Sequence, residues 1–402
     1  MASEHSRALR ILFLCLTCIG TGQSMLFAIL PPAAREIGLT PFQVSTIFAT
    51  SASIWVFVSP RWGRQSDVWG RRVVIIIGLL GFATSMGLLA TMIYVGLHKL
   101  LPLSVVYPLM IASRCVFALV GSGTGPASQA YVADRTSRSE RTAGVALVNA
   151  ALGLGQTIGP GVGAVLAVLG LLAPLYFASG MAVFSAFMIW MYLPEEGPPI
   201  EKGSPRPPRL SFRDPRVLPF LVVATSLQAV QATTSITLAF YMQDTLGLDA
   251  HQTVQYSGAG FVVLAVAGLF TQLVLVQRLK PSPRTMQRVG VSLALLAFVA
   301  FLSASRFPLY LGALLLLGAG LGLSRPGNAA GASLAVEPLE QGSVAGLTNA
   351  IGVLGNVFGP LLGTSLYHFL PQGPYILNTV LMMLALIFIF TNPRLRRAYG
   401  DR

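Results

Sequence analysis

Two arginines lie within long apolar runs of the sequence, where an unpaired charge is expensive. Arg114 follows about eleven residues after the start of the run 103–133, and Arg325 lies about sixteen residues into the run 309–335. A guanidinium group at the centre of a membrane-spanning segment costs roughly 2.5–3.5 kcal/mol, so such a residue usually has a function. Its N–H donors suit a carboxylate or a phosphate. We predict a functional role for Arg114, whereas Arg325 either anchors a substrate or extends to the membrane surface.

Uncharged polar residues are spaced through several of the other apolar runs. Each one alone is as compatible with a hydrogen bond between helices as with a ligand. As a set, they indicate a polar surface inside the protein, and together with the two arginines they form the predicted substrate-binding site. These residues are Gln23, Asn149, Gln156, Gln228, Gln231, Asn349 and Asn356.

A short charged segment at residues 63–72 separates two apolar runs. Gly63 and Gly70 permit the tight reversal that a short loop needs. Asp67 and Arg71 are four residues apart, so one helical turn would let them pair. A basic loop can serve topology alone, but glycines, an aspartate and paired arginines at this spacing favour a conformational gate.

Glycines recur every four residues in one apolar run of each half of the chain. This spacing makes one smooth helix face, so that a neighbouring backbone can approach closely, and each proline allows a bend. Because the motif occurs in both halves, it indicates a packing seam that both halves need. The residues are Gly155, Gly159, Pro160 and Gly163, and again Gly355, Gly359, Pro360 and Gly363.

The composition is that of a multi-spanning membrane protein. Of the 402 residues, 54% are hydrophobic and 10% are charged, against about 25% charged in soluble domains. The mean hydropathy is +0.70. The net charge of +13 comes from lysines and arginines scattered in short groups between apolar runs, which fits a membrane surface and not a nucleic acid.

Twelve stretches are long enough to cross a bilayer as helices. The first is expected to be a retained helix and not a cleaved signal, because its apolar run exceeds a signal core. The predicted spans are 8–30, 42–62, 73–97, 103–133, 142–168, 172–193, 217–241, 252–276, 287–305, 309–335, 343–367 and 374–391.

The positive charges predict the orientation of these spans. With a cytoplasmic amino terminus, 22 of the 27 lysines and arginines fall on the cytoplasmic side, three fall outside, and Arg114 and Arg325 fall within spans. This bias predicts that both termini face the cytoplasm.

A proline-rich linker at residues 195–216 divides the chain into two halves. The predicted domains are therefore a six-helix bundle at 1–194, the cytoplasmic linker, and a second six-helix bundle at 217–402. The halves resemble each other: Gly38-Leu39 with Gln43 matches Gly247-Leu248 with Gln252 at an offset of 209, and the glycine motifs match at an offset of 200. The fold class is thus all-α integral membrane, with two pseudo-symmetric bundles of six helices.

The segment 63–72 resembles a signature of the major facilitator superfamily, and the chain resembles its twelve-span drug:proton antiporters. Val68 and Gln65 depart from the commonest residues of that signature. The resemblance implies that Asp67 docks on the amino end of span 11 in the outward-open state, with Arg71 and Asp134 as charge partners. It also implies that Arg114 lies near a proton path and that Gly155–Gly163 accompanies antiport.

Several absences bear on function. None of the 14 acidic residues falls at the centre of a predicted span, which makes a cationic drug a less natural substrate. The histidines lie near span ends or in tails, so no metal is predicted, and no phosphate-binding P-loop occurs. The cysteines predict no disulfide framework.

The sequence predicts a secondary transporter and not an enzyme, without a cofactor. The first hypothesis is proton-coupled efflux of a drug or small metabolite by a monomer in a bacterial cytoplasmic membrane. The alternative is an importer or facilitator of a small anionic or polar metabolite, such as a carboxylate or a siderophore.

Overall fold

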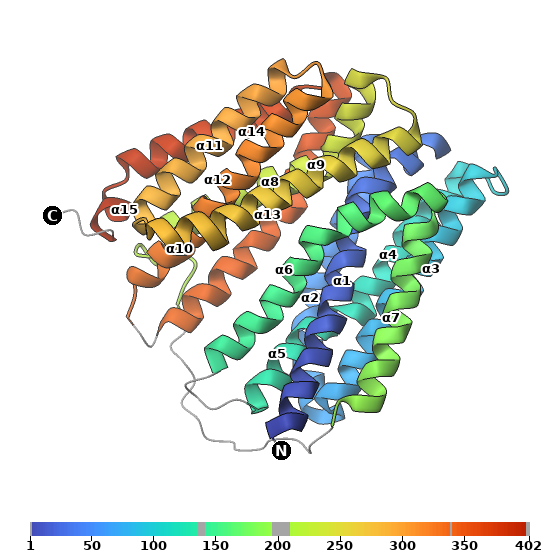
Figure 1. Ribbon diagram of the computed structural model, residues 1–402, viewed down its shortest axis with the longest axis horizontal. Coiled ribbons are helices and arrows are strands. Elements are labelled where there is room, and N and C mark those ends of the chain that lie inside the picture. Colours follow the sequence, from blue (N-terminus) through green and yellow to red (C-terminus); the bar gives the residue numbers. More distant parts are fainter. Residues whose placement is uncertain (1, 136–140, 195–209, 338–339, 399–402) are drawn as a thin grey trace. The chain divides into compact units, whose positions relative to one another are not determined.

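The computed structural model describes residues 2–135, 141–194, 210–337 and 340–398. Within these ranges the regular secondary structure is helical, and no strand is present. Eleven helices among the described residues are long and apolar enough to cross a membrane, and α13 covers the remaining predicted span, 343–367. The all-α membrane fold is thereby confirmed (Figure 1). The helices are α1 Ala2–Ile37, α2 Pro41–Trp69, α3 Arg71–Leu97, α4 Leu103–Val120, α5 Thr124–Arg135, α6 Arg141–Leu166, α7 Ala173–Tyr192, α8 Leu218–Leu246, α9 Ala250–Phe270, α10 Val276–Leu279, α11 Pro283–Ser303, α12 Phe307–Leu334, α13 Gln341–Phe369, α14 Gly373–Thr391 and α15 Pro393–Ala398.

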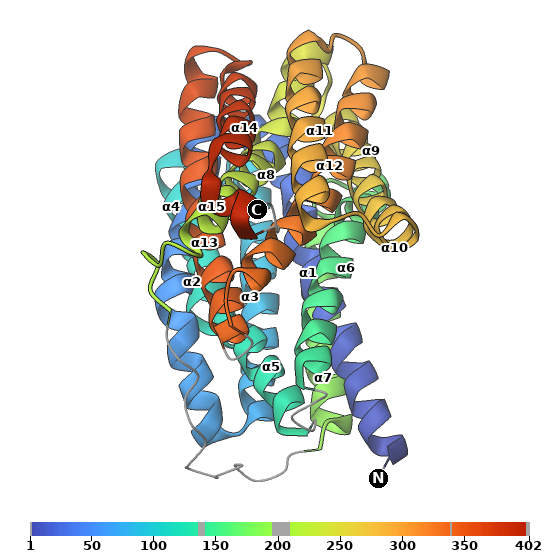
Figure 2. The same ribbon diagram turned by 90° about the vertical axis from the view of Figure 1, so that its left-hand side faces the viewer.

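The chain forms two compact units. The first comprises Met1–Lys202 with Asp249–Gly258, and the second comprises Gly203–Leu248 with Ala259–Arg402. In the first, α1 packs on α6 and α7, and α3 packs on α4 and α7; in the second, α8 packs on α13 and α14, and α11 packs on α12 and α14. Corresponding pairs of spans therefore pack together in each unit (Figures 1 and 2).

The repeated Gly-Leu motif has a local structural reason. Gly38 adopts a φ of 97° and ends α1, and Gly247 adopts a φ of 65° and ends α8. Such backbone angles favour glycine, which has no Cβ to clash. The next helix then begins with a capping box in both halves of the sequence: Thr40 with Gln43, and Asp249 with Gln252. The motif thus encodes the same turn between the first two spans of each half.

The reversal between α2 and α3 is shorter than the sequence suggests. Residues 63–69 are the last two turns of α2, so the prediction of a loop there is wrong, and Gly70 alone makes the turn with a φ of 95° and a ψ of 142°. A Cβ built on Gly63 would lie 3.5 Å from the Pro126 Cβ, which is ordinary contact. Gly63 therefore does not make the reversal, and only Gly70 requires glycine's conformational freedom.

The predicted fourth span is interrupted. A 3-10 turn at Gly121–Gly123 separates α4 from α5. The Trp62 indole Nε1 of α2 donates to the Leu119 carbonyl at 2.6 Å, beside this turn. A Cβ on Gly123 would lie 2.9 Å from the Trp62 Cβ, so the glycine lets α2 approach closely. The interruption therefore separates Arg114 on α4 from Asp134 on α5.

Candidate functional site

Arg114 is sealed inside the first unit, with 3% of its surface exposed. Its Nη2 donates to Gln23 Oε1 of α1 at 3.0 Å, and its guanidinium carbon lies 5.2 Å from the centroid of the Phe117 ring. Its Nε and Nη1 are buried and have no hydrogen-bond partner among the described residues. The charge is therefore stabilised by an amide oxygen and an aromatic face, without a carboxylate in the described part of the chain.

Arg325 takes part in a hydrogen-bonded chain that crosses three helices of the second unit. Its Nη2 donates to Gln228 Oε1 of α8 at 3.0 Å. Gln228 Nε2 in turn donates to Asn356 Oδ1 of α13 at 2.9 Å. Arg325 and Asn356 are exposed, whereas Gln228 is partly buried. The structure therefore brings three of the predicted binding residues together.

Asn328 holds α12 in place one turn beyond Arg325, a role that the sequence analysis missed. Its Oδ1 accepts from Gln287 Nε2 of α11 at 2.8 Å, and its Nδ2 donates to the Phe220 carbonyl of α8 at 3.0 Å. Both amide side chains are buried, with 2% and 0% of their surface exposed. The signal available in the sequence was an amide side chain three residues after Arg325, within an apolar run.

The other predicted binding residues whose side chains are described do not join either arginine. Asn149 accepts a long hydrogen bond of 3.4 Å from Gln129. Gln231 has a buried Oε1 without a partner among the described residues, and Gln156 is exposed. The side chain of Asn349 lies outside the described residues. Among the predicted residues with described side chains, Gln23 and Gln228 each bond to an arginine, and Asn356 bonds to Gln228.

The joint between α2 and α3 carries a compact polar cluster. Arg71 forms an ion pair with Asp67 and a second one with Asp134 of α5, at 3.1 Å from Nε to Oδ2. Its Nη1 also donates to Ser66 Oγ at 2.5 Å. The Asp67 side chain is 58% exposed, whereas those of Arg71 and Asp134 are 14% and 19% exposed. Asp67 is therefore the member of the cluster that is most open to another partner.

The glycine motifs lie at close helix contacts, between α1 and α6 and between α8 and α13. A Cβ on Gly155 would lie 2.1 Å from the Thr17 carbonyl oxygen, and one on Gly159 would lie 1.9 Å from Ser24 Oγ, both on α1. In the second unit, Cβ atoms on Gly355 and Gly359 would lie 2.8 and 2.6 Å from Ala229 of α8. Gly163 and Gly363 approach the same partner helices through Met25 and Thr233, so each motif packs one helix on another; Pro160 and Pro360 lie within α6 and α13.

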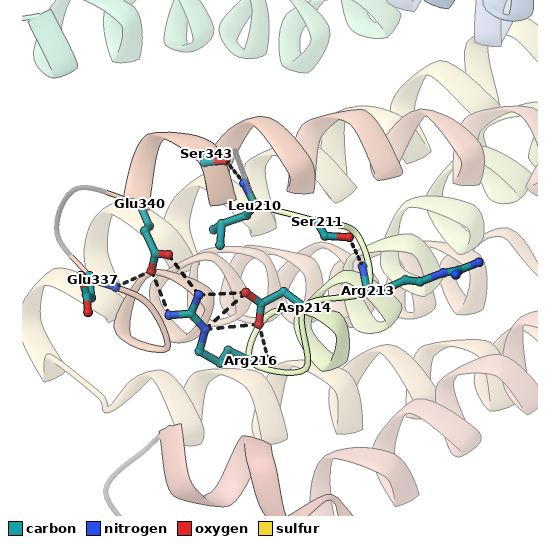
Figure 3. Close-up of polar contacts among 8 residues, drawn as sticks. All are labelled: Leu210, Ser211, Arg213, Asp214, Arg216, Glu337, Glu340 and Ser343. Carbon is teal, nitrogen blue, oxygen red and sulfur yellow. Dashed lines mark hydrogen bonds and ion pairs between the residues drawn. The ribbon is translucent and has the colours of Figure 1, made fainter. Parts of the chain in front are cut away.

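A second polar cluster joins the start of α8 to the start of α13 (Figure 3). We call it the linker clamp, formed by Leu210, Asp214, Arg216, Glu340 and Ser343. Arg216 bonds to both carboxylates, at 2.8 Å to Asp214 Oδ2 and 2.9 Å to Glu340 Oε2, and the Leu210 N–H donates to Ser343 Oγ at 3.0 Å. From the sequence, Leu210, Asp214 and Arg216 were expected in the linker, Glu340 between two spans, and Ser343 at the start of the span 343–367.

The charged groups of the linker clamp shift one another's pKa values. The hydrogen bond from Arg216 lowers the pKa of the Asp214 carboxyl below its ordinary 3.8. A hydrogen bond from the same guanidinium lowers the pKa of Glu340 below its ordinary 4.5, and both carboxylates raise the pKa of Arg216. The clamp is therefore fully charged at neutral pH.

The fold and these polar clusters define the class of protein. The model of the Major Facilitator Superfamily matches residues 12–354 and 282–400. The chain belongs to this superfamily, and it is a multi-pass membrane transporter of small molecules and not an enzyme.

Relatives and solved structures match this chain over most of its length. Multidrug resistance protein 1 of Bacillus subtilis (strain 168) is 26% identical over 372 residues, covering 91% of each chain. The human major facilitator superfamily domain-containing protein 10 is 29% identical over 337 residues, covering 77% of this chain and 70% of its own. The inward-facing, occupied crystal structure of a bacterial homolog of human lysosomal Spinster matches with a TM-score of 0.77 at 13% identity, covering 99% of this chain and 98% of the other.

Proposed function

We propose that this transporter exports a drug or a small metabolite in exchange for protons, by alternating access across a bacterial cytoplasmic membrane. The observation that carries the proposal is the likeness to a multidrug resistance protein over 91% of both chains. The protein acts as a monomer with both termini in the cytoplasm. The predicted binding residues, led by Arg114 and Arg325, contact the substrate or set the field around it.

Transport into inside-out vesicles tests this proposal. An acid-inside pH gradient should drive uptake of an exported compound such as tetracycline, which the name of a relative from Escherichia coli specifies, and a protonophore that removes the gradient should stop it. Vesicles that carry Arg114→Gln are the matched control for passive leak. Uptake that does not depend on the gradient would contradict proton coupling, and absence of tetracycline uptake would exclude tetracycline as a substrate.

We further propose that the Arg71 cluster acts as a gate. Asp67 alternates between Arg71 and a second partner as the transporter changes conformation, because its side chain is the most exposed of the cluster. Asp67→Asn should therefore slow transport while leaving the substrate Kd near the wild-type value. Equal transport rates for the variant and the wild type would contradict the gate.

A second candidate function is import or facilitated movement of a small anionic or polar metabolite. Two arginines within the spans, without a carboxylate partner among the described residues, favour it. A crystal structure of the human relative MFSD10 describes that protein as an organic anion transporter. Uptake into right-side-out vesicles, driven by the substrate gradient alone, would distinguish this function from export.

A further inference from the structure

We infer that Arg325, Gln228 and Asn356 form a binding subsite for the carboxylate group of an organic anion. The inference deepens the proposed transport function, on which it rests, by assigning a substrate class to named atoms. It concerns the second unit alone, whose helices α12, α8 and α13 each contribute one of the three residues.

The guanidinium fixes the direction of the whole hydrogen-bonded chain. An arginine side chain can only donate, so the Gln228 atom that faces Arg325 must be its oxygen. The Gln228 NH2 group then faces Asn356, and Asn356 must present its oxygen in return. The two amide orientations follow from the arginine and are not interchangeable.

This direction leaves mainly donors for a ligand. Within the described residues, the single hydrogen bond of Arg325 is the one to Gln228, so most of its N–H groups remain available. The Asn356 NH2 group also has no partner there, because the chain uses only its oxygen. A surface with a guanidinium at one end and an amide NH2 at the other suits a group with two acceptor oxygens.

The positive charge of Arg325 also favours a carboxylate as the ligand. None of the ion pairs among the described residues includes Arg325. An uncompensated cation within a span is expensive in hydrocarbon, so the face that carries it is not a lipid-facing one. A bound carboxylate would supply the missing negative charge in a low-dielectric setting, where charge pairs are poorly screened.

Exposure distinguishes this arginine from Arg114. Both donate through Nη2 to a glutamine oxygen at 3.0 Å. Arg114 is 3% exposed beneath Phe117, so a ligand reaches it only after side chains move. Arg325 is exposed as it stands. The open pair, and not the sealed one, is therefore the ligand-binding subsite.

Helix contacts on both sides of the subsite also hold its residues in place. Asn328, one turn from Arg325, ties α12 to α11 and α8 through two hydrogen bonds of 2.8 and 3.0 Å. On the other side, a Cβ on Gly355 would lie 3.0 Å from the Gln228 Cβ, so α13 and α8 are in close contact beside the amide. A binding group held by such contacts loses little conformational entropy when a ligand arrives.

Three probes of the same size test the inference on the purified full-length protein in detergent: benzoate, benzamide and benzylammonium. Each is titrated while the melting temperature is followed, since a ligand of the folded state raises it. Benzoate should bind most tightly. Arg325→Gln should weaken benzoate binding roughly 10- to 100-fold, the loss expected for hydrogen bonds to a charged group, and Arg325→Lys should restore only part of it.

A second variant removes donors without removing the arginine. Asn356→Asp keeps the oxygen that Gln228 requires, but it removes the NH2 group and adds a negative charge. It should abolish the preference for benzoate and favour benzylammonium. Arg306→Gln, which removes an exposed arginine from the N-cap of the same helix, is the matched control and should leave all three affinities unchanged.

Binding in detergent needs neither a gradient nor a direction of transport, so its outcome is separate from the vesicle experiments. Failure of benzoate to bind the wild type, equal binding of the three probes, or a benzoate Kd unchanged in both Arg325→Gln and Asn356→Asp would overturn the subsite while leaving the proposed transport function standing.

Discussion

At the scale of single residues, each half pairs an arginine of its fourth span with a glutamine of its first span. The halves do so from non-equivalent positions. Gly20 and Ala229 are repeat mates at the offset of 209, which makes Ala232 and not Gln228 the mate of Gln23. The two pairs therefore lie at different depths along their helices, and the repeat alone does not account for them.

The sealed arginine leads to a prediction about stability and function. Arg114→Met with Gln23→Leu should leave the melting temperature equal to or above that of the wild type, because apolar side chains replace a buried charge with unsatisfied donors. Transport by this double variant should be lost. Melting curves and vesicle uptake on the same preparations measure both quantities.

The single variant Gln23→Leu is the control for this prediction. It leaves the buried guanidinium without its one amide partner, so it should melt below both the wild type and the double variant. A double variant less stable than Gln23→Leu would show that Arg114 stabilises the fold by another route.

At the scale of helices, the glycine seam of α6 predicts a graded series of substitutions. Gly159→Ala would place a methyl group 1.9 Å from Ser24 Oγ and 2.4 Å from the Thr21 carbonyl oxygen, so backbone must shift. We expect a loss of roughly 1–3 kcal/mol of stability, as for other overpacked sites. The melting temperature in detergent is the measurement.

Gly153→Ala is the matched control on the same helix, since nothing lies within 4 Å of its Cβ position. Alanine there should be neutral or stabilising by up to about 1 kcal/mol, because it favours the helix. Gly163→Ala should be milder than Gly159→Ala, because its nearest neighbour is the flexible Met25 side chain at 3.2 Å. Equal effects at all three glycines would contradict the seam.

The linker clamp predicts a pH dependence with a definite sign. Its two carboxyl pKa values lie below their ordinary 3.8 and 4.5, so the clamp stabilises the fold above about pH 4.5. This contribution is lost as the pH falls through the lowered values. Arg216→Gln should therefore melt below the wild type at pH 7, and the difference should vanish in acid. A difference that persists unchanged below pH 3.8 would exclude the two carboxylates as its source.

At the scale of the whole molecule, the charge bias predicts the orientation of the chain. In a variant without the three native cysteines, Ser204→Cys in the linker should react with a membrane-impermeant maleimide in inside-out vesicles and not in intact cells. Lys99→Cys, in the loop between the third and fourth spans, should react in intact cells and not in inside-out vesicles. Labelling of Ser204→Cys from the outside would overturn the orientation.

Much of the architecture was predictable because hydropathy, glycine spacing and turn motifs act locally. The twelve spans, the paired halves and the close seam at Gly159 follow from such signals. Helix ends were less predictable: residues 64–67 are polar, yet they belong to α2, and Arg71 pairs with Asp67 and Ser66 across the single turn at Gly70. Polarity marks where a helix leaves the apolar region and not where it ends.

The candidate site was predictable in composition and not in pairing. Arg114, Arg325 and their glutamines stood out as polar groups within apolar runs. Which glutamine meets which arginine depends on helix rotation and depth, to which no local signal in the chain corresponds. Asn328 and Gln287 were missed for the same reason, since their importance lies in a contact between α12 and α11.

The interruption at Gly121–Gly123 has a mechanical consequence. The 3-10 turn separates the segment of the fourth span that bears Arg114 from the segment that bears Asp134. The Trp62 indole donates a hydrogen bond to the Leu119 carbonyl beside this turn. Bending at this hinge sacrifices fewer backbone hydrogen bonds than bending an intact helix would. We therefore expect any bend of the fourth span to fall at this turn, between Arg114 and the α2–α3 joint, whereas α12 is a single α-helix from Phe307 to Leu334.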